Sequence, residues 1–215
     1  MQVAILLYDR FTVLDAIGPY QVLSGLPGAE VVFAAERPGL IRDEVGSLIL
    51  SAGAGLPDVP RPDIIVVPGG PGQHSQMQDG PLHEWLRAAD QASVWTTSVC
   101  TGSLILAAAG LLTGRRATTH WLAVDELGRL GATPVGERVV FDGKFVTAAG
   151  VSSGIDMALA LAGQIAGDQV AQAIQLGIEY DPQPPYDAGS PERAPADLVT
   201  ALRARSRFIL TGHRG

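Results

Sequence analysis

Residues 63–68, with the sequence Asp-Ile-Ile-Val-Val-Pro, constrain the fold more strongly than any other segment of the chain. A strand with one face in water alternates polar and apolar residues, whereas this segment has an unbroken run of β-branched ones. Such a run is typical of a parallel strand that is covered by helices on both faces. It ends at Gly69-Gly70-Pro71-Gly72, which is a strong turn signal.

Strand-like and helix-like segments alternate along the rest of the chain. Strands are predicted at residues 3–7, 31–35, 63–68 and 93–99, with 47–51 in an edge hairpin, and helices at residues 14–23, 81–89, 101–109, 121–130, 153–166, 168–179 and 196–210. This alternation predicts a single α/β domain over residues 1–215, with a mostly parallel central sheet flanked by helices. Residues 181–215 are expected to form an irregular tail that ends in the C-terminal helix.

A hairpin is predicted near residue 142. Residues 138–141 and 144–147 are strand-like and flank the pair Asp142-Gly143. This pair is typical of the two central positions of a type I′ turn.

Composition excludes several classes of protein. Hydrophobic residues make up 47% of the 215 residues and the formal net charge is −7, which disfavours disorder, nucleic-acid binding and an anionic membrane surface. The longest nearly apolar stretch, residues 104–112, is shorter than the ~20 residues of a membrane span. With a single cysteine, no clustered metal ligands and no recognisable secretion signal, we expect a cytoplasmic protein without an internal disulfide.

Cys100 lies where a predicted strand runs directly into a predicted helix. The small residues Gly102 and Ser103 permit a sharp turn, as in a nucleophile elbow, which exposes its nucleophile above the sheet. The positive end of the helix dipole is expected to favour the thiolate. The alternative is a buried, inert cysteine, which is the usual state of a lone one.

Two further features are predicted at the same edge of the sheet, because the carboxyl ends of parallel strands meet there. Asp15 follows the first strand and is a candidate acid/base group with a pKa adjusted by partial burial; the alternative is a helix cap. The amides of Gly69 and Gly70 are candidates for an anion pocket, and the alternative is an ordinary turn.

His120 is a weaker candidate for a catalytic residue. A Cys–His pair would indicate a cysteine hydrolase. A single histidine beside Trp121 is more typical of a structural role, and both interpretations stay open at this point.

The chain resembles the ThiJ/PfpI superfamily, whose members share the class I glutamine amidotransferase-like (flavodoxin-like) fold. The matching segments are Ile65-Val66-Val67-Pro68-Gly69-Gly70, Ser98-Val99-Cys100-Thr101-Gly102 and Ala117-Thr118-Thr119-His120-Trp121. Within the superfamily the chain most resembles the isocyanide hydratases, through Leu14-Asp15-Ala16-Ile17-Gly18-Pro19, Cys100-Thr101 and the tail motifs at 179–182 and 185–191.

This resemblance implies a mechanism for hydrating an isocyanide to an N-substituted formamide. Cys100 would attack the terminal carbon to give a thioimidate, Asp15 would be the general acid/base, and Thr101 would position Asp15 or the water. The Gly70 amide would hold or polarise the reacting groups, and Val151 would line the pocket beside Cys100. The resemblance also implies a homodimer with the tail near the active site, and no metal or organic cofactor; the chain has no P-loop or dinucleotide-binding motif.

Differences from other branches of the superfamily argue against the functions of those branches. The protease-like branch has histidine directly after the cysteine, where this chain has Thr101, and the deglycase branch typically has glutamate where this chain has Asp15. A further branch fuses the domain to a helix-turn-helix regulator, for which the chain has no room after residue 215. A thiol redox or ligand sensor, and a glyoxalase or amidase, remain as alternative functions.

Overall fold

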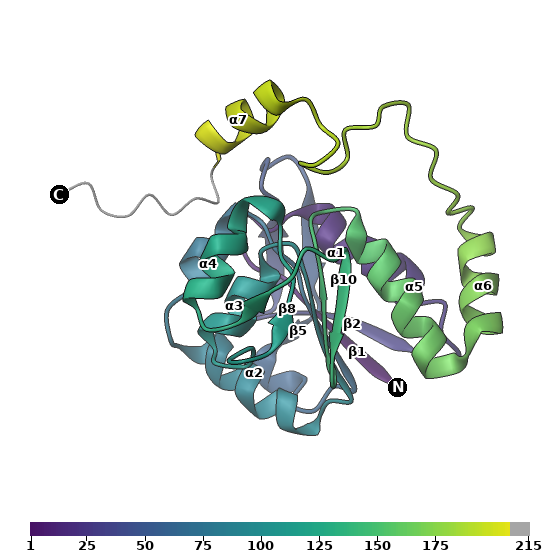
Figure 1. Ribbon diagram of the computed structural model, residues 1–215. Helices are drawn as coiled ribbons and strands as arrows, with labels where there is room; N and C mark the ends of the chain where they lie inside the picture. Colours follow the sequence, from purple (N-terminus) through teal and green to yellow (C-terminus); the bar gives the residue numbers. More distant parts are fainter. Residues whose placement is uncertain (207–215) are drawn as a thin grey trace.

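A computed structural model of the protein describes residues 1–206 and is built around one seven-stranded sheet (Figure 1). The strand order is β10-β11-β7-β6-β1-β2-β5. The strands are β1 (Gln2–Leu6), β2 (Glu30–Ala35), β5 (Ala54–Gly55), β6 (Ile64–Val67), β7 (Trp95–Val99), β10 (Val139–Asp142) and β11 (Phe145–Ala148). Neighbouring strands are parallel except β10 and β11, which confirms the predicted mostly parallel sheet.

Helices cover both faces of this sheet. Helices α1 (Val13–Leu23) and α5 (Ser153–Ala166) pack on one face with α6 (Asp168–Gly177) outside α5, and α2 (Pro81–Ala92), α3 (Gly102–Ala108) and α4 (Val124–Arg129) lie on the other face (Figure 1). All four residues of β6 are fully buried, as their unbroken apolar run predicts. The predicted α/β architecture is therefore confirmed.

Several short elements refine the predicted boundaries. The segment near residue 50 forms β4 (Ile49–Ala52), which pairs with β3 (Gly39–Arg42) in a separate antiparallel hairpin. The predicted helix at 121–130 starts as a 3₁₀ turn, Trp121–Ala123, before α4. Two further 3₁₀ turns, Leu56–Asp58 and Pro71–Gln76, and a second two-stranded pair, β8 (Arg116–Ala117) with β9 (Thr133–Pro134), are not anticipated by the sequence patterns.

The predicted type I′ turn is wrong by one residue. Asp142 pairs with Phe145, so the two loop residues are Gly143 and Lys144. Gly143 has φ +62°, whereas neither Asp142 nor Lys144 has a positive φ, a pattern that fits type II′ better than type I′.

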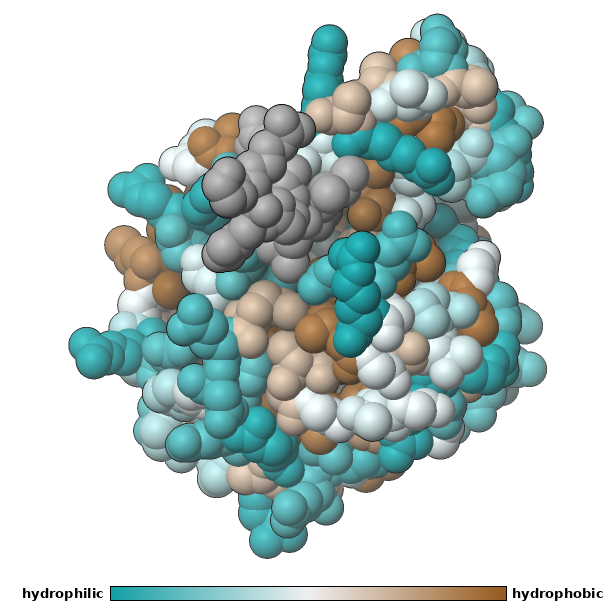
Figure 2. Space-filling view, turned by 60° about the vertical axis from the view of Figure 1, so that its left-hand side comes forward, coloured by the Kyte–Doolittle hydropathy of each residue, from teal (hydrophilic) through white to brown (hydrophobic). Residues whose placement is uncertain are grey.

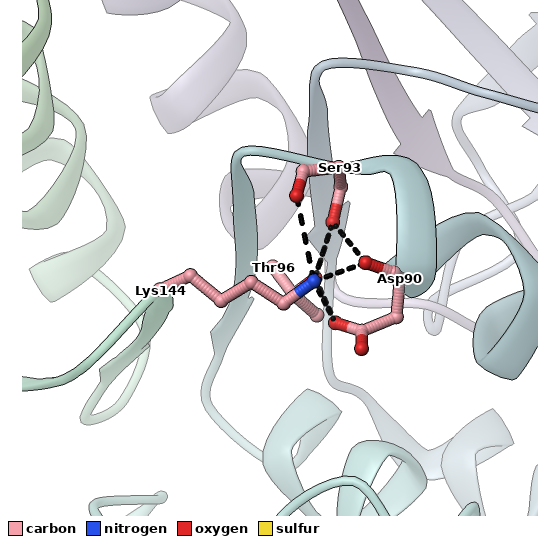
Figure 3. A network of polar contacts seen from close by, with 4 residues as sticks. All are labelled: Asp90, Ser93, Thr96 and Lys144. Carbon is pink, nitrogen blue, oxygen red and sulfur yellow. Dashed lines mark hydrogen bonds and ion pairs between the residues drawn. The ribbon is translucent and has the colours of Figure 1, made fainter.

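The side chain of the loop residue Lys144 contacts the C-terminal end of α2 (Figure 3). Its Nζ lies 3.1 Å from the carboxylate of Asp90 and also contacts the Asp90 carbonyl, at the C-terminal end of α2. The Thr96 hydroxyl donates to the same carboxylate at 2.6 Å. A lysine at this end of a helix is favoured by the helix dipole. Lys144 lies in the two-residue loop of the β10–β11 hairpin, where its carbonyl accepts the Thr96 amide at 3.0 Å and its side chain reaches α2.

The C-terminal part leaves the body of the protein after α6. Residues 182–195 contain no helix or strand, and α7 (Ala196–Ala204) follows at the top of the view (Figure 1). The Arg203 guanidinium lies 5.7 Å from the centroid of the Trp121 ring. The predicted last helix reaches residue 210, and its residues 207–210 lie outside the described residues. None of the helices in residues 1–206 is long and apolar enough to cross a membrane.

Figure 2 shows one face of the molecule by hydropathy. Hydrophilic residues surround this face, and hydrophobic and neutral ones gather toward its centre.

Candidate functional site

Cys100 occupies a strained turn between β7 and α3. Its φ is +58°, in the left-handed region, which costs a residue other than glycine on the order of 1–3 kcal/mol. Its N–H donates to the carbonyl of Ala149 at 2.8 Å and to that of Ala148 at 3.1 Å. A Cβ on Gly102 would overlap the Val67 carbonyl oxygen, so the turn requires glycine there. These features match the predicted nucleophile elbow.

The carbonyl of Cys100 is held from the other side. It accepts hydrogen bonds from the hydroxyl of Thr119 at 3.0 Å and from that of Ser103 at 3.1 Å. The segment around residue 119 therefore supports the elbow through the hydroxyl of Thr119.

Asp15 is fixed to the turn that follows β6. Its Oδ2 accepts a hydrogen bond from the Gly69 amide at 2.9 Å. Its buried Oδ1 has no partner of regular hydrogen-bond geometry in residues 1–206, although the Cys100 thiol lies close enough to the carboxyl group to act on its pKa. The Asp15 amide donates to the carbonyl of Thr12 at 3.1 Å, and the Thr12 amide donates to the carbonyl of Gly69 at 2.8 Å. A closed set of three hydrogen bonds therefore sets the place of this carboxyl group, leaving one oxygen for chemistry.

Thr101 is fixed to the same turn. The Gly70 amide donates to Thr101 Oγ1 at 3.0 Å. Gly70 has φ +129°, and a Cβ there would overlap the Thr12 amide nitrogen, so only glycine fits. The two glycine amides thus donate to Asp15 and Thr101; the sequence leaves an anion pocket and an ordinary turn as alternatives for these glycines.

The site is buried more deeply than predicted. Cys100, Asp15 and Thr101 are each 0% exposed, although the elbow was expected to expose its nucleophile and Asp15 to be partly buried. Helices α1 and α5 pack against each other over this edge, where Gly18 lies against Ile155. Val151 is half-buried against the core, two residues beyond the carbonyl that holds Cys100.

Burial also decides the protonation state of the site. It raises the pKa of Asp15 to about 8, against the opposing effects of the Gly69 amide and the Cys100 thiol; Glu44 raises it further. Burial, together with the nearby Asp15, raises the pKa of Cys100 well above its usual value, although the Thr101 amide and hydroxyl act in the other direction. Both directions disfavour the expected thiolate in this structure and favour the protonated form of each group.

His120 lies near the elbow with a neutral ring. Burial lowers its pKa to about 4, so the ring is neutral at pH 7. Its Nδ1 accepts the Leu122 amide at 3.3 Å, and a Cβ on Gly150 would overlap the ring. These contacts support the structural interpretation.

Three residues of the site were missed by the sequence analysis. Tyr8 is buried, donates its hydroxyl to the Pro68 carbonyl at 2.8 Å, and has a pKa raised by burial and then by Asp15, Cys100 and Glu44. Thr12 and Glu44 are joined by a hydrogen bond of 3.0 Å. Tyr8 directly follows a predicted strand, which is a weak signal, whereas nothing local marks Glu44.

The described residues show no metal centre. No group of three or more histidine, cysteine, aspartate or glutamate side chains within residues 1–206 is arranged to hold a metal ion.

Comparison with known proteins places this geometry in context. The chain is 43% identical over 206 residues to an isonitrile hydratase of Pseudomonas putida, which covers 96% of this chain and 90% of that protein. A crystal structure of a ThiJ/PfpI family protein from Pseudomonas syringae superposes with a TM-score of 0.92 at 34% identity, covering 99% of this chain and 90% of the other.

More distant relatives share the fold. The crystal structure of Drosophila melanogaster DJ-1beta superposes with a TM-score of 0.75 at 21% identity, covering 83% of this chain and 97% of the other. The model of the DJ-1/PfpI family matches residues 1–164, which include the elbow, Asp15 and the glycine turn. This chain is therefore a member of the DJ-1/PfpI family.

Proposed function

We propose that this chain is an isonitrile hydratase, which adds water to an isocyanide R–N≡C and releases the formamide R–NH–CHO. The observation that carries this proposal is the 43% identity to the Pseudomonas putida isonitrile hydratase over 96% of the chain. The geometry agrees with it, because a thiol and a carboxyl group lie together in a buried site. Hydration of an isocyanide needs a nucleophile and a proton carrier.

In the first half of the reaction, the sulfur of Cys100 forms a bond to the terminal carbon of the isocyanide. Asp15, protonated at pH 7 because its pKa is about 8, gives its proton to that carbon. The thiol proton passes to Asp15 as the carbon–sulfur bond forms. The product is a thioimidate, R–N=CH–S–Cys100, with Asp15 protonated again, so that protons balance without a free thiolate.

In the second half, water adds to the thioimidate carbon. Asp15 gives its proton to the imine nitrogen and accepts one from the water, which leaves R–NH–CH(OH)–S–Cys100. The carbon–sulfur bond then breaks, the hydroxyl proton returns to sulfur through Asp15, and the formamide leaves. The unpartnered Oδ1 is the oxygen available for these transfers, because Oδ2 is held by the Gly69 amide.

The other site residues hold these two groups in place. Thr101 accepts the Gly70 amide with its oxygen, which leaves the hydroxyl hydrogen for the sulfur or the reacting nitrogen. Gly70 thus acts through Thr101. Val151 contributes an apolar wall beside the elbow, where the R group would lie. No metal or organic cofactor is required by these steps.

The test is the formation of formamide from a small aryl isocyanide. Wild-type protein is expected to produce it, and the Cys100→Ala variant is expected to have no measurable turnover. Asp15→Asn should lower turnover at least a hundredfold, in line with the loss of a general acid/base. Ser24→Ala, which removes an exposed hydroxyl at the end of α1, serves as the control. Appreciable activity in Cys100→Ala would refute the nucleophile assignment.

The alternative of a thiol redox sensor is not favoured by this site. Such sensors use an accessible thiol of low pKa, whereas Cys100 is 0% exposed and its pKa is raised. Consumption of methylglyoxal without consumption of isocyanide would instead indicate the glyoxalase alternative.

We further propose that the protein is a cytoplasmic homodimer. Neither α6 nor α7 contributes a fully buried residue. Several large apolar side chains on these two helices and in the segment between them are exposed, namely Leu176, Tyr186, Leu198 and Leu202. A second copy is the proposed cover for part of this surface. Sedimentation should give a dimer at micromolar concentration, and a monomer would contradict the proposal.

A further inference from the structure

Glu44 is held in a fixed place by the connection between β3 and β4. The Glu44 amide donates to the Phe11 carbonyl at 3.0 Å, and the adjacent Asp43 forms a parallel bridge with Phe11. Asp43 is buried and organises the loop, because its Oδ1 accepts the amides of Gly46 at 2.7 Å and Leu48 at 3.1 Å. The backbone of Glu44 is therefore attached to the segment that leads into α1.

The Glu44 side chain takes an unusual partner. Its Oε2 accepts the hydroxyl of Thr12 at 3.0 Å. Thr12 is the N-cap residue of α1, where a threonine side chain usually accepts an amide of the first turn, yet its side chain makes no such bond. Glu44 thus determines how Thr12 is oriented.

The charge of Glu44 is not neutralised by a neighbouring cation. The side chain is half-buried, and in residues 1–206 no lysine, arginine or histidine nitrogen lies within ion-pair distance of it. A negative charge in this position acts on the carboxyl group of Asp15. Glu44 is hydrogen-bonded to the Thr12 side chain, and the Thr12 carbonyl in turn accepts the Asp15 amide in the first turn of α1.

We propose that Glu44 is a positioning residue of this site: through its hydrogen bond with Thr12 it fixes the first turn of α1, which carries Asp15, and its negative charge disfavours a second negative charge on Asp15. The inference rests on the proposed hydratase function for its role in turnover. The hydrogen-bonded path from Glu44 through Thr12 to Asp15 is independent of that function.

The direction of the pH effect follows from the groups that act on Asp15. Burial is the largest cause of the raised Asp15 pKa; the Gly69 amide and the Cys100 thiol oppose it, and Glu44 adds to it. The buried Tyr8, whose own pKa Asp15 helps to raise, also lies near this carboxyl group. Tyr8 and Cys100 have raised pKa values and are neutral at pH 7, so Glu44 is the charged neighbour. Removing its charge makes the Asp15 carboxylate easier to form and lowers the Asp15 pKa.

The first experiment measures kcat and KM against pH for wild-type protein and three variants. Turnover should fall as the pH rises through the pKa of Asp15, about 8. In Glu44→Gln this fall should move to lower pH and kcat at pH 8 should drop several-fold with KM nearly unchanged. Glu44→Asp, which retains the charge, should restore the position of the fall. Glu30→Gln, an exposed carboxylate at the start of β2, should leave both unchanged.

A second measurement does not depend on turnover. Infrared difference spectroscopy follows the protonated carboxyl band of Asp15, identified by its loss in Asp15→Asn. The midpoint of this band should lie at lower pH in Glu44→Gln than in wild type. If wild type hydrates no isocyanide but the midpoint moves, the proposed function fails and the electrostatic role of Glu44 stands. A midpoint and a pH profile identical to wild type in Glu44→Gln would overturn the inference.

Discussion

Asp15 should cost the protein stability at neutral pH, so its replacement by asparagine should stabilise the fold while it abolishes turnover. The pKa of Asp15 is raised from 3.8 in an unstructured chain to about 8 in the folded protein. Between these values the folded state holds a proton that the unfolded state has released. The contribution of this residue to stability therefore falls as the pH rises from about 4 to about 8.

The magnitude follows from the pH interval. One unit of pKa difference corresponds to about 1.4 kcal/mol, and pH 7 lies about three units above 3.8, so Asp15 lowers the free energy of unfolding by about 4 kcal/mol at pH 7. Asparagine does not titrate, so this loss of stability is absent from the variant. Its NH₂ group would, however, replace the unpartnered Oδ1 and remain unpaired at a cost of about 1–3 kcal/mol. The net expectation is a gain of about 1–3 kcal/mol at pH 7.

The assay is urea unfolding of wild type and Asp15→Asn at matched pH values from about 3.5 to 8.5. The difference between the two proteins cancels the titration of all other groups. At pH 7 the variant should have the larger free energy of unfolding. Below pH 4 wild type should be the more stable protein, because Asp15 is then protonated in both the folded and the unfolded state, whereas the unpaired amide of the variant remains. A difference that does not change with pH would refute the assigned protonation of Asp15, and with it the role of Asp15 as an acid at pH 7.

Other consequences of the structure can be measured separately. Alkylation of Cys100 by iodoacetamide should be much slower at pH 7 than that of an exposed cysteine, and its rate should still be rising at pH 9. Thr101→Val, which removes the acceptor of the Gly70 amide, should lower kcat by about tenfold to a hundredfold without unfolding the protein, as circular dichroism would verify. Gly102→Ala should lower the free energy of unfolding in urea by at least about 3 kcal/mol, because its Cβ would overlap a β6 carbonyl. Lys144→Met should lower it by about 1–3 kcal/mol, with turnover unchanged.

Features with a local sequence signal were predicted well. The unbroken apolar run of β6 predicts a strand that is buried on both faces, and the strand–Cys100–Gly102 sequence predicts the elbow. Asp15 and Cys100 are distant in sequence, yet they meet because each follows a strand of one parallel sheet.

Features that depend on tertiary contacts were missed or predicted wrongly. The β10–β11 hairpin turns at Gly143 and Lys144, one residue beyond the Asp142–Gly143 turn signal, and the side chain of Lys144 contacts Asp90 of α2, a tertiary contact that no local pattern shows. Glu44 joins the site because the loop between β3 and β4 is bound to Phe11 and Thr12, just before α1, which no local pattern indicates. The thiolate prediction rested on the helix dipole alone, whereas burial of Cys100 by the helices above it acts more strongly in the opposite direction.

The closed, neutral state of the site has a consequence for how it can react. A thiolate and a carboxylate placed side by side would repel each other and would be costly to bury. A thiol and a carboxylic acid avoid both costs, and each proton that Asp15 gives up is replaced by one from Cys100 or from water. An uncharged substrate such as an isocyanide can enter this apolar surrounding without introducing an unpaired charge. The burial that raises both pKa values therefore suits a reaction in which protons move at every step and no group needs to be ionised beforehand.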